Sequence, residues 1–259
     1  MLQDRHDDTI PGEPYSVTAE FYDILQAETD RRVAERRFGS AARAAQVGIV
    51  DVGAGTGIVT EVLLDRSAAP IHAVEPAAPM RVALLTRLAG MRADQRARVT
   101  VHPEAFQDAG LAGLADLVVC SNIAGVLEPS ERRAMWSAAA AALTPGGVVL
   151  LEPPPQELPD KPTVEELPPV RLGPDTYSAQ VCTAPDRGLL SVTYTYRVEH
   201  DGEIVREEAE EFTMWPASSD TVCDELRQAG LVVSGTSDGV IRATAAQDPQ
   251  PRAGSALRG

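Results

Sequence analysis

The chain has 259 residues, 44% of them hydrophobic, and carries a formal net charge of −15 at pH 7. This length suits one elaborated domain with a substantial buried core better than two independent domains. The negative charge argues against a nucleic-acid partner, whose phosphates would be repelled, and therefore favours a small-molecule substrate.

The sequence carries no signal for a membrane protein or for a secreted, disulfide-bonded protein. No apolar run approaches the length of a membrane span, and residues 1–8 lack the layout of a signal peptide. The cysteines are far apart and odd in number, which argues against a disulfide framework or a zinc cluster. We therefore expect a cytoplasmic protein without a metal site, in which the cysteines remain reduced: Cys120, Cys182 and Cys223.

The first elements in chain order are a tail and a helical segment. Residues 1–14 contain two prolines and several charges without periodicity, which predicts a disordered tail. Apolar residues then recur at the three- and four-residue spacing of a helix: Val17, Phe21, Ile24 and Leu25. A charged stretch, residues 30–37, continues this pattern towards the first strand.

A glycine-rich turn at residues 53–57 follows the β-branched run at residues 47–52 and precedes a helical pattern at residues 58–64. Glycines let the backbone approach a ligand closely, and the N–H groups of a helix start point at whatever lies above the turn. The dinucleotide fingerprint requires glycine at the position of Ile58. The acid that opens the turn, Asp51, would repel a pyrophosphate but favour an ammonium or sulfonium group.

A second acid, Glu75, ends the next apolar run at residues 71–74. A carboxylate at the tip of a second strand can accept hydrogen bonds from both hydroxyls of a ribose. The alternative is an ordinary solvated loop acid. Its position in the pattern favours the ligand-binding interpretation.

Residues 51–57 together with Glu75 resemble the binding signature of class I S-adenosylmethionine-dependent methyltransferases, and the resemblance extends over residues 15–245. It implies an α/β fold with a Rossmann-like, seven-stranded, mostly parallel sheet and helices on both faces. It also implies an N-terminal helical lid and an antiparallel β insert after strand five. The implied cofactor is S-adenosyl-L-methionine, and the implied acceptor is a small molecule.

The later elements alternate as such a fold requires. A helix spans residues 78–88, and short strands span residues 98–102 and 116–120. A helix from Pro129 ends before the fifth strand at residues 148–152. Ligands sit beyond the carboxyl ends of such strands, so the residues that follow the fourth strand, Ser121 and Asn122, should face the transferred methyl group or its acceptor.

The resemblance assigns roles to individual residues. The glycine backbone would surround the methionyl part near Asp51, Glu75 would hold the ribose, and residues 104–106 would hold the adenine. Tyr15 and Tyr22 would reach the methionyl carboxylate or the sulfur, although packing alone is an equal alternative. The complete set of expected cofactor contacts is Tyr15, Tyr22, Asp51, Gly53, Ala54, Gly55, Gly57, Glu75, Pro76, Met80, Glu104, Ala105, Phe106, Ser121 and Asn122.

The region after Pro153–Pro155 breaks the helix–strand alternation. Apolar and polar residues alternate in residues 191–198, and the turn at residues 200–202 leads into a second, acidic run, which predicts an antiparallel hairpin or small sheet. Residues 152–215 hold 14 Asp or Glu against 5 Lys or Arg, a balance of −9. This acidity would attract an amine, although a solvated outer face is the simpler explanation.

Sugar-amine N,N-dimethyltransferases and glycine N-methyltransferase-like enzymes carry a substrate-covering insert at the same place. We therefore expect a core at residues 15–152 and 216–246 with lid helices at its N-terminus, and a covering insert at residues 153–215. Residues 1–14 and 247–259 would be tails. An exposed insert also offers a surface for a homodimer contact.

No catalytic base stands out, because each of the four histidines has a simpler structural or solvated role. The catalytic candidates are Asn122 and Tyr22, and Glu152, Tyr177 and Tyr194 are further residues that would orient an acceptor. An amine needs only to bind unprotonated, so a missing base favours N- over O-methylation. The expected function is methylation of a small molecule, such as an amino sugar, in specialised-metabolite or antibiotic biosynthesis.

Two alternatives come from other classes. One is an enzyme of this fold that uses S-adenosylmethionine for cyclisation, decarboxylation or hydrolysis. The other is a non-catalytic cofactor-binding partner subunit, which the intact Asp51, glycines and Glu75 argue against. A nicotinamide dehydrogenase ranks last because of Ile58 and Asp51.

Overall fold

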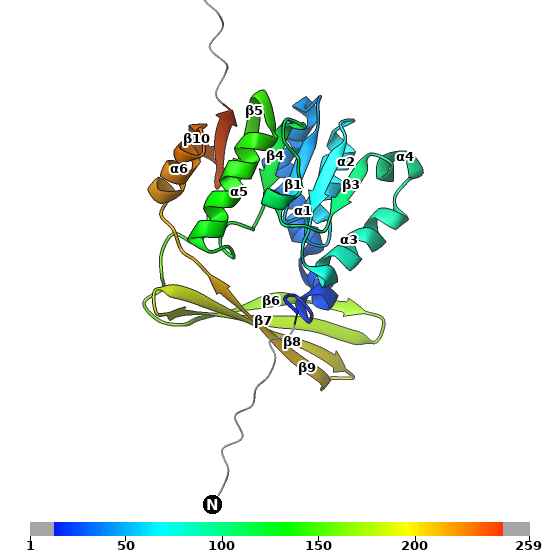
Figure 1. The fold of residues 1–259 in the computed structure, drawn as a ribbon. Helices are drawn as coiled ribbons and strands as arrows, with labels where there is room; N and C mark the ends of the chain where they lie inside the picture. Colours follow the sequence, from blue (N-terminus) through cyan, green and yellow to red (C-terminus); the bar gives the residue numbers. More distant parts are fainter. Residues whose placement is uncertain (1–12, 246–259) are drawn as a thin grey trace, which may run out of the picture.

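The protein, described by a computed structural model over residues 13–245, contains two β-sheets and six α-helices in that range (Figure 1). The predicted tails lie outside the described residues, except for Glu13 and Pro14 at the end of the first tail. Over the described range, no helix combines the length and the apolar character that a bilayer crossing would require.

The larger sheet has seven strands in the order β10-β11-β5-β4-β1-β2-β3. Neighbouring strands from β5 to β3 in this order are parallel, whereas β11 runs antiparallel to both β5 and β10. This confirms the predicted Rossmann-like, mostly parallel sheet. The strands are β1 Ile49–Val52, β2 Ile71–Val74, β3 Val99–His102, β4 Ala115–Cys120, β5 Leu143–Leu151, β10 Leu231–Ser237 and β11 Val240–Ala245.

Helices cover both faces of this sheet. One buried cluster contains Trp136 and Val118, and the other contains Phe38, Leu63 and Leu117. The neighbours Leu117 and Val118 belong to different clusters because successive side chains of a strand point to opposite faces. The helices are α1 Thr18–Ala44, α2 Ile58–Arg66, α3 Ala78–Gly90, α4 Ala93–Arg96, α5 Pro129–Ala142 and α6 Ser219–Gln228, with a 3₁₀ turn η1 at Phe106–Asp108.

Local sequence signals explain most of the helix boundaries, and the N-terminal segment differs from expectation. A capping box of Glu128 and Glu131 starts α5. The N-cap of α6 is Ser218, whose hydroxyl accepts the N–H of Thr221 at 3.1 Å. The segment before β1 is one continuous helix of 27 residues, α1, rather than several lid helices.

The second sheet is antiparallel throughout and has four strands in the order β6-β7-β8-β9. The predicted turn between its last two strands is present, with Asp201 and Gly202 at φ values of 51° and 82°. The sheet is larger than a single hairpin. Its strands are β6 Thr163–Leu172, β7 Asp175–Asp186, β8 Leu189–His200 and β9 Glu203–Met214.

The start of α1 docks on one face of this second sheet. Phe21 stacks on Tyr196 with ring centroids 4.5 Å apart, and the Thr18 N–H donates to the Glu210 carboxylate at 2.7 Å. Arg206 lies over the Phe21 ring and pairs with Glu20 at 2.6 Å. The first turns of α1 therefore connect the two sheets, and the chain after β5 passes from one sheet to the other (Figure 1).

Candidate active site

A cavity of about 920 Å³ opens beyond the carboxyl ends of the central strands of the larger sheet. The segments after β1, β2, β4 and β5 form one wall, and α1 with the residues preceding it forms another. The end of β9 and Trp215 complete the lining from the second sheet. This is the edge at which parallel α/β sheets bind their ligands.

The glycine turn after β1 has a backbone that side chains would disturb. Gly53, Gly55 and Gly57 all have positive φ values, and Gly57 is the N-cap of α2. A Cβ atom at Gly57 would lie 2.6 Å from the Leu84 side chain. At Gly55 the added atom would meet nothing closer than 4.0 Å, so the turn borders open space on the cavity side.

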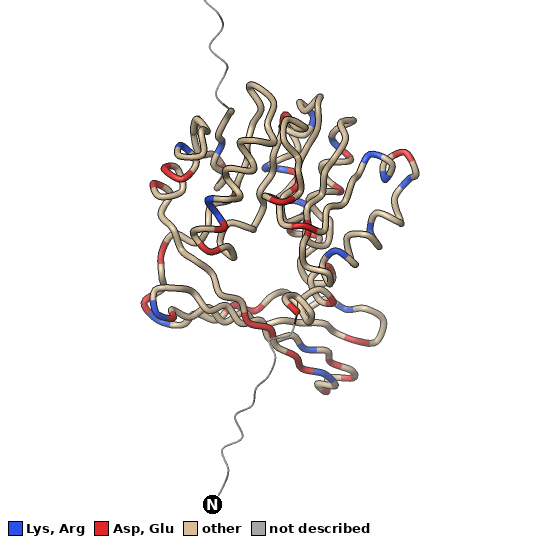
Figure 2. The backbone as a smooth tube through the Cα atoms, viewed as in Figure 1, with Lys and Arg blue, Asp and Glu red and all other residues tan. Residues whose placement is uncertain are grey.

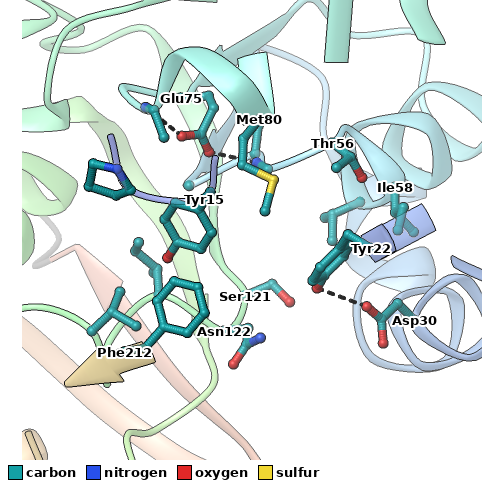
Figure 3. Close-up of a pocket in the computed structure, with 18 of the residues that line it drawn as sticks. Tyr15, Tyr22, Asp30, Thr56, Ile58, Glu75, Met80, Ser121, Asn122 and Phe212 are labelled. Atoms are coloured by element: carbon teal, nitrogen blue, oxygen red, sulfur yellow. Dashed lines mark hydrogen bonds between the residues drawn. The ribbon is translucent and has the colours of Figure 1, made fainter. Parts of the chain in front are cut away.

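Glu75 holds this turn from the tip of β2 (Figure 3). One carboxylate oxygen accepts the Gly55 N–H at 2.7 Å, and the other accepts the Ala77 N–H at 2.8 Å. Burial raises the pKa of Glu75, while these two backbone hydrogen bonds and the charge of Arg81 oppose the rise. Each oxygen keeps further acceptor capacity, and the residue lines the cavity.

Asp51 lies in β1 with a side chain that is 1% exposed. The Thr60 hydroxyl donates to one oxygen at 2.6 Å, whereas the other oxygen, Oδ1, has no hydrogen-bond partner. Burial raises the pKa of Asp51 to about 7, and the charge of Glu75 adds to the rise. The side chain is therefore a carboxyl that exchanges its proton near neutral pH.

Aromatic side chains close the cavity on the side of the second sheet (Figure 3). Tyr15 adopts a φ of 67°, which is uncommon for a tyrosine, and its ring lies 5.0 Å from that of Phe212 on β9. Burial raises the pKa of Tyr15 to about 12, with further contributions from Glu75 and Glu210. The Tyr15 hydroxyl is therefore protonated at neutral pH.

Two sets of hydrogen-bonded polar residues also line the cavity. From α1, the Tyr22 hydroxyl donates to the Asp30 carboxylate at 2.9 Å (Figure 3). Beyond β5, the Glu152 carboxylate accepts the Ser121 hydroxyl at 3.0 Å and the Asn122 N–H at 2.8 Å. Glu152 also pairs with Arg37 of α1. Asn122 has a φ of 52°, so the end of β4 turns sharply at the cavity.

Comparison with known proteins shows which family and which solved structures the chain is similar to. Residues 50–149 match the family described as "Methyltransferase domain". No curated protein sequence matches the chain. Many solved structures have the same fold, and three of them are described here. DesVI from Streptomyces venezuelae superposes with a TM-score of 0.74 at 20% identity, over 88% of this chain and 98% of that chain.

The second structure is CalS10 from Micromonospora echinaspora, described as an amino pentose methyltransferase involved in calicheamicin biosynthesis. It superposes with a TM-score of 0.64 at 25% identity, over 84% of this chain and 90% of that chain. The third is the sugar N-methyltransferase KedS8 from Streptoalloteichus sp ATCC 53650, with a TM-score of 0.65 at 20% identity, over 89% and 93% of the two chains.

Residues 50–149 form a methyltransferase domain, and the described chain has the fold of S-adenosylmethionine-dependent methyltransferases. The recognition made from residues 51–57 and Glu75 is thereby confirmed at the level of the family.

Most of the residues that the sequence proposed for the site lie together in the methyltransferase. The members that line the cavity are Tyr15, Tyr22, Gly53, Ala54, Gly55, Glu75, Pro76, Met80, Ser121 and Asn122. They come from the first turn of the chain, α1, the glycine turn, the end of β2, α3 and the end of β4. Both catalytic candidates, Asn122 and Tyr22, are among them.

The remaining proposed residues do not line this cavity, and their surroundings explain why. Asp51 points beneath the turn towards Thr60, and Gly57 is occupied with capping α2. Phe106 is 6% exposed and belongs to the hydrophobic core. Glu104 is exposed, and Ala105 starts the 3₁₀ turn that carries Phe106 inward. An adenine contact from residues 104–106 stays a prediction.

Sequence reasoning missed Asp30 and Arg37, the two charged residues that α1 contributes to the cavity. A helical signal was available, because Tyr22, Asp30, Val33 and Arg37 recur at spacings that place them on one side of a helix, and all four line the cavity. Glu152 lines the cavity as suggested, whereas Tyr177 and Tyr194 do not. Within residues 13–245, no group of three His, Cys, Asp or Glu side chains is arranged to hold a metal ion.

Proposed function

We propose that this methyltransferase transfers the methyl group of S-adenosyl-L-methionine to the nitrogen of a small-molecule amine, such as an amino sugar. The observation that carries the proposal is a single cavity in which a glycine turn and Glu75 lie opposite an acid-lined wall on α1 and β5. Its volume of about 920 Å³ is near the upper end of the range for ligand sites, so a cofactor and a small acceptor fit together.

The residues at the turn fit the cofactor. Gly53 and Gly55 border the space that a nucleoside with a methionyl group would occupy, and Glu75 keeps acceptor capacity for its ribose hydroxyls. The Asp51 oxygen that lacks a partner is buried beneath the same turn, where an ordered water would complete its hydrogen bonding. Met80 and Tyr15 add apolar contact around the cofactor.

When bound, S-adenosylmethionine supplies an activated methyl group, so the residues of the chain chiefly align the acceptor and exclude water. Tyr15, Phe212 and Trp215 close the cavity and limit the access of solvent. A smaller cavity of about 440 Å³ adjoins this one through Asn122 and Glu152. It offers space for the part of the acceptor that does not react.

Charge favours an amine over an alcohol as the acceptor. Of the residues that the structure describes, five acids and one base line the cavity, namely Glu13, Asp30, Glu75, Glu152 and Glu211 against Arg37. The second sheet is also acidic, as the Asp and Glu positions in the lower part of Figure 2 show. Such a surface attracts cations, and a protonated amine is the cationic form of a methyl acceptor. CalS10, at 25% identity, carries an amino-sugar activity in its description, which supports the same substrate class and a role in specialised metabolism.

Methyl-labelled S-adenosylmethionine tests the proposal when it is offered with pairs of acceptors that differ only in an amino or a hydroxyl group. Methyl glycosides of aminohexoses and of the matching hexoses form one such set. We expect label in the amine product of at least one pair and none in its alcohol partner. Turnover to S-adenosylhomocysteine without a labelled product would instead identify a non-methylating enzyme. A protein that does not bind S-adenosylmethionine would contradict the proposal, because the methylating and the non-methylating enzyme both require it.

The sequence also predicted a homodimer through the insert, and we retain it as a proposal. Both edge strands of the second sheet carry exposed apolar side chains, among them Val164 on β6 and Val205 on β9. Exposed edges of this kind invite pairing with a second chain. Sedimentation equilibrium would show a dimer that the change Val205→Lys dissociates, and a monomer at all concentrations would contradict the proposal.

A further inference from the structure

Asp30 is the acid in the cavity wall whose surroundings are least expected for a structural carboxylate. It lies on α1 and lines the cavity, and its carboxylate accepts a hydrogen bond from the Tyr22 hydroxyl at 2.9 Å (Figure 3). Tyr22 in turn lies close enough to Asn122 for hydrogen bonding with that side chain to affect its pKa. Of the two catalytic candidates from the sequence, Tyr22 contacts Asp30 directly and Asn122 lies next to Tyr22.

Of the other four acids that line the cavity, Glu13 is exposed and the remaining three already have partners. Glu75 accepts two backbone N–H groups, and Glu152 is neutralised by Arg37 and also accepts the Ser121 hydroxyl. Glu211 is exposed and accepts a hydroxyl from Ser191 on the second sheet. Within residues 13–245, Asp30 accepts only the Tyr22 hydroxyl and forms no ion pair. A partly buried carboxylate without a cationic partner is stabilised when a cation enters the cavity.

The charged groups around Asp30 also favour a cationic ligand. Burial raises the pKa of Asp30, and the charges of Glu152 on β5 and Asp23 on α1 raise it further, while the Tyr22 hydrogen bond opposes the rise. On β8, burial raises the pKa of Tyr194, and the charge of Asp30 raises it further. Among the described residues, the one base in the cavity lining, Arg37, pairs with Glu152 and not with Asp30. The Asp30 carboxyl is therefore a better proton acceptor than an exposed aspartate.

We propose that Asp30 receives the acceptor amine as its ammonium ion and accepts one of its protons, with Tyr22 as the residue that positions the carboxylate. This inference rests on the proposed function and names the group that prepares the nucleophile. An ammonium ion has no lone pair and cannot attack a methyl group, so an acid-lined cavity that attracts it also needs a proton acceptor.

The step balances in atoms and charge. An N–H bond of the ammonium breaks, its electron pair stays on nitrogen, and the proton passes to an Asp30 oxygen. The neutral amine then forms an N–C bond to the methyl group while the C–S bond breaks and its electron pair remains on sulfur. The products are S-adenosylhomocysteine and an N-methylammonium ion, and Asp30 returns its proton to solvent when they leave.

The test uses two cofactor analogues and no acceptor. S-adenosylhomocysteine lacks the methyl group and its positive charge, whereas sinefungin carries an amino group on a carbon that replaces the methylated sulfur. In the wild-type protein, calorimetry should give tighter binding of sinefungin than of S-adenosylhomocysteine. The change Asp30→Asn should reduce this preference by about tenfold or more, the usual effect of removing a charged hydrogen-bond partner. Tyr22→Phe should reduce it by a smaller factor.

A matched control and the pH dependence sharpen the test. Glu28→Gln removes a charge from the same helix at an exposed position, where Glu28 pairs with Arg32, and should leave the preference unchanged. The wild-type preference for sinefungin should grow as pH rises and Asp30 ionises, and it should stay flat in Asp30→Asn between about pH 5 and pH 8. Ionisation of Glu75 affects both ligands and cancels in their ratio.

The outcomes separate this inference from the proposed function. If wild-type protein binds neither analogue, the proposed function is contradicted. If both analogues bind but the preference is the same in wild type and Asp30→Asn, the role of Asp30 is overturned and the function stands. If Asp30→Asn no longer binds S-adenosylhomocysteine, the wild-type titration decides, because a preference that does not change with pH overturns the proposal.

Discussion

Asp51, the buried acid under the glycine turn, should make the stability of the folded protein depend on pH. Asp51→Asn replaces a titratable carboxyl by an amide of the same shape, which can still accept the Thr60 hydroxyl. The pKa of Asp51 is about 7 in the folded protein against an ordinary 3.8. Since each tenfold change in proton affinity is worth about 1.4 kcal/mol, ionising this group in the fold costs about 4 kcal/mol in total.

The raised pKa of Asp51 means that the folded protein loses stability as pH rises. Because the folded state holds the proton of Asp51 more tightly than the unfolded state, its contribution to stability is complete below about pH 4 and is lost as pH rises through about 7. With these two pKa values, about 2.5 kcal/mol of the loss falls between pH 5 and pH 8. Asparagine binds no proton, so the variant should lack this loss.

Urea unfolding of the ligand-free protein, followed by tryptophan fluorescence, measures the effect. Relative to wild type, the free energy of unfolding of Asp51→Asn should become more favourable by about 2.5 kcal/mol from pH 5 to pH 8. Asp224→Asn is the control, because Asp224 is an exposed acid paired with Arg227 and should give a curve parallel to wild type. Parallel curves for wild type and Asp51→Asn would refute the reasoning.

The remaining predictions concern stability and reactivity. Glu225→Gln should lower the free energy of unfolding by about 3–5 kcal/mol in urea, because it leaves Arg132, which is 2% exposed, without its charged partner; a loss below 1 kcal/mol would contradict this. Gly57→Ala should lower the melting temperature, because the added methyl group meets Leu84 at 2.6 Å and φ is +90°; an unchanged melting temperature would argue against the strain. Cys120 should resist alkylation until the protein unfolds, because burial raises the pKa of its thiol and removes its exposure; mass spectrometry of the alkylated native protein would reveal any early reaction there.

The sequence predicted the parts of the fold that local chemistry determines. The run at residues 47–64 specifies strand, turn and helix because positive φ values at the turn require glycine, and Asp201 with Gly202 specifies a hairpin in the same way. The strands β6 and β7 were harder to foresee. Pro168 and Pro169 interrupt the alternation of β6, and the pairing register shifts between Leu167 and Val170 to accommodate them.

The candidate site was predicted where it follows the strand ends and missed where it depends on packing. Ser121 and Asn122 could be placed because the fourth strand ends before them. Asp30 could not, since its role depends on the direction in which one face of α1 points after it has docked on the second sheet. Asp51 was expected to face the ligand, yet the alternation of side chains along β1 directs it beneath the turn, to Thr60.

We propose that the glycine turn and Glu75 bind the nucleoside of S-adenosylmethionine. Calorimetric titration of wild-type protein and Glu75→Gln with S-adenosylhomocysteine tests it most directly, with unfolding curves to show that both are folded. The wild type should bind, and the variant should bind at least about tenfold more weakly, because an amide cannot accept hydrogen bonds on both sides as the carboxylate does. Equal affinity in the two proteins, or no binding by the wild type, would contradict the claim.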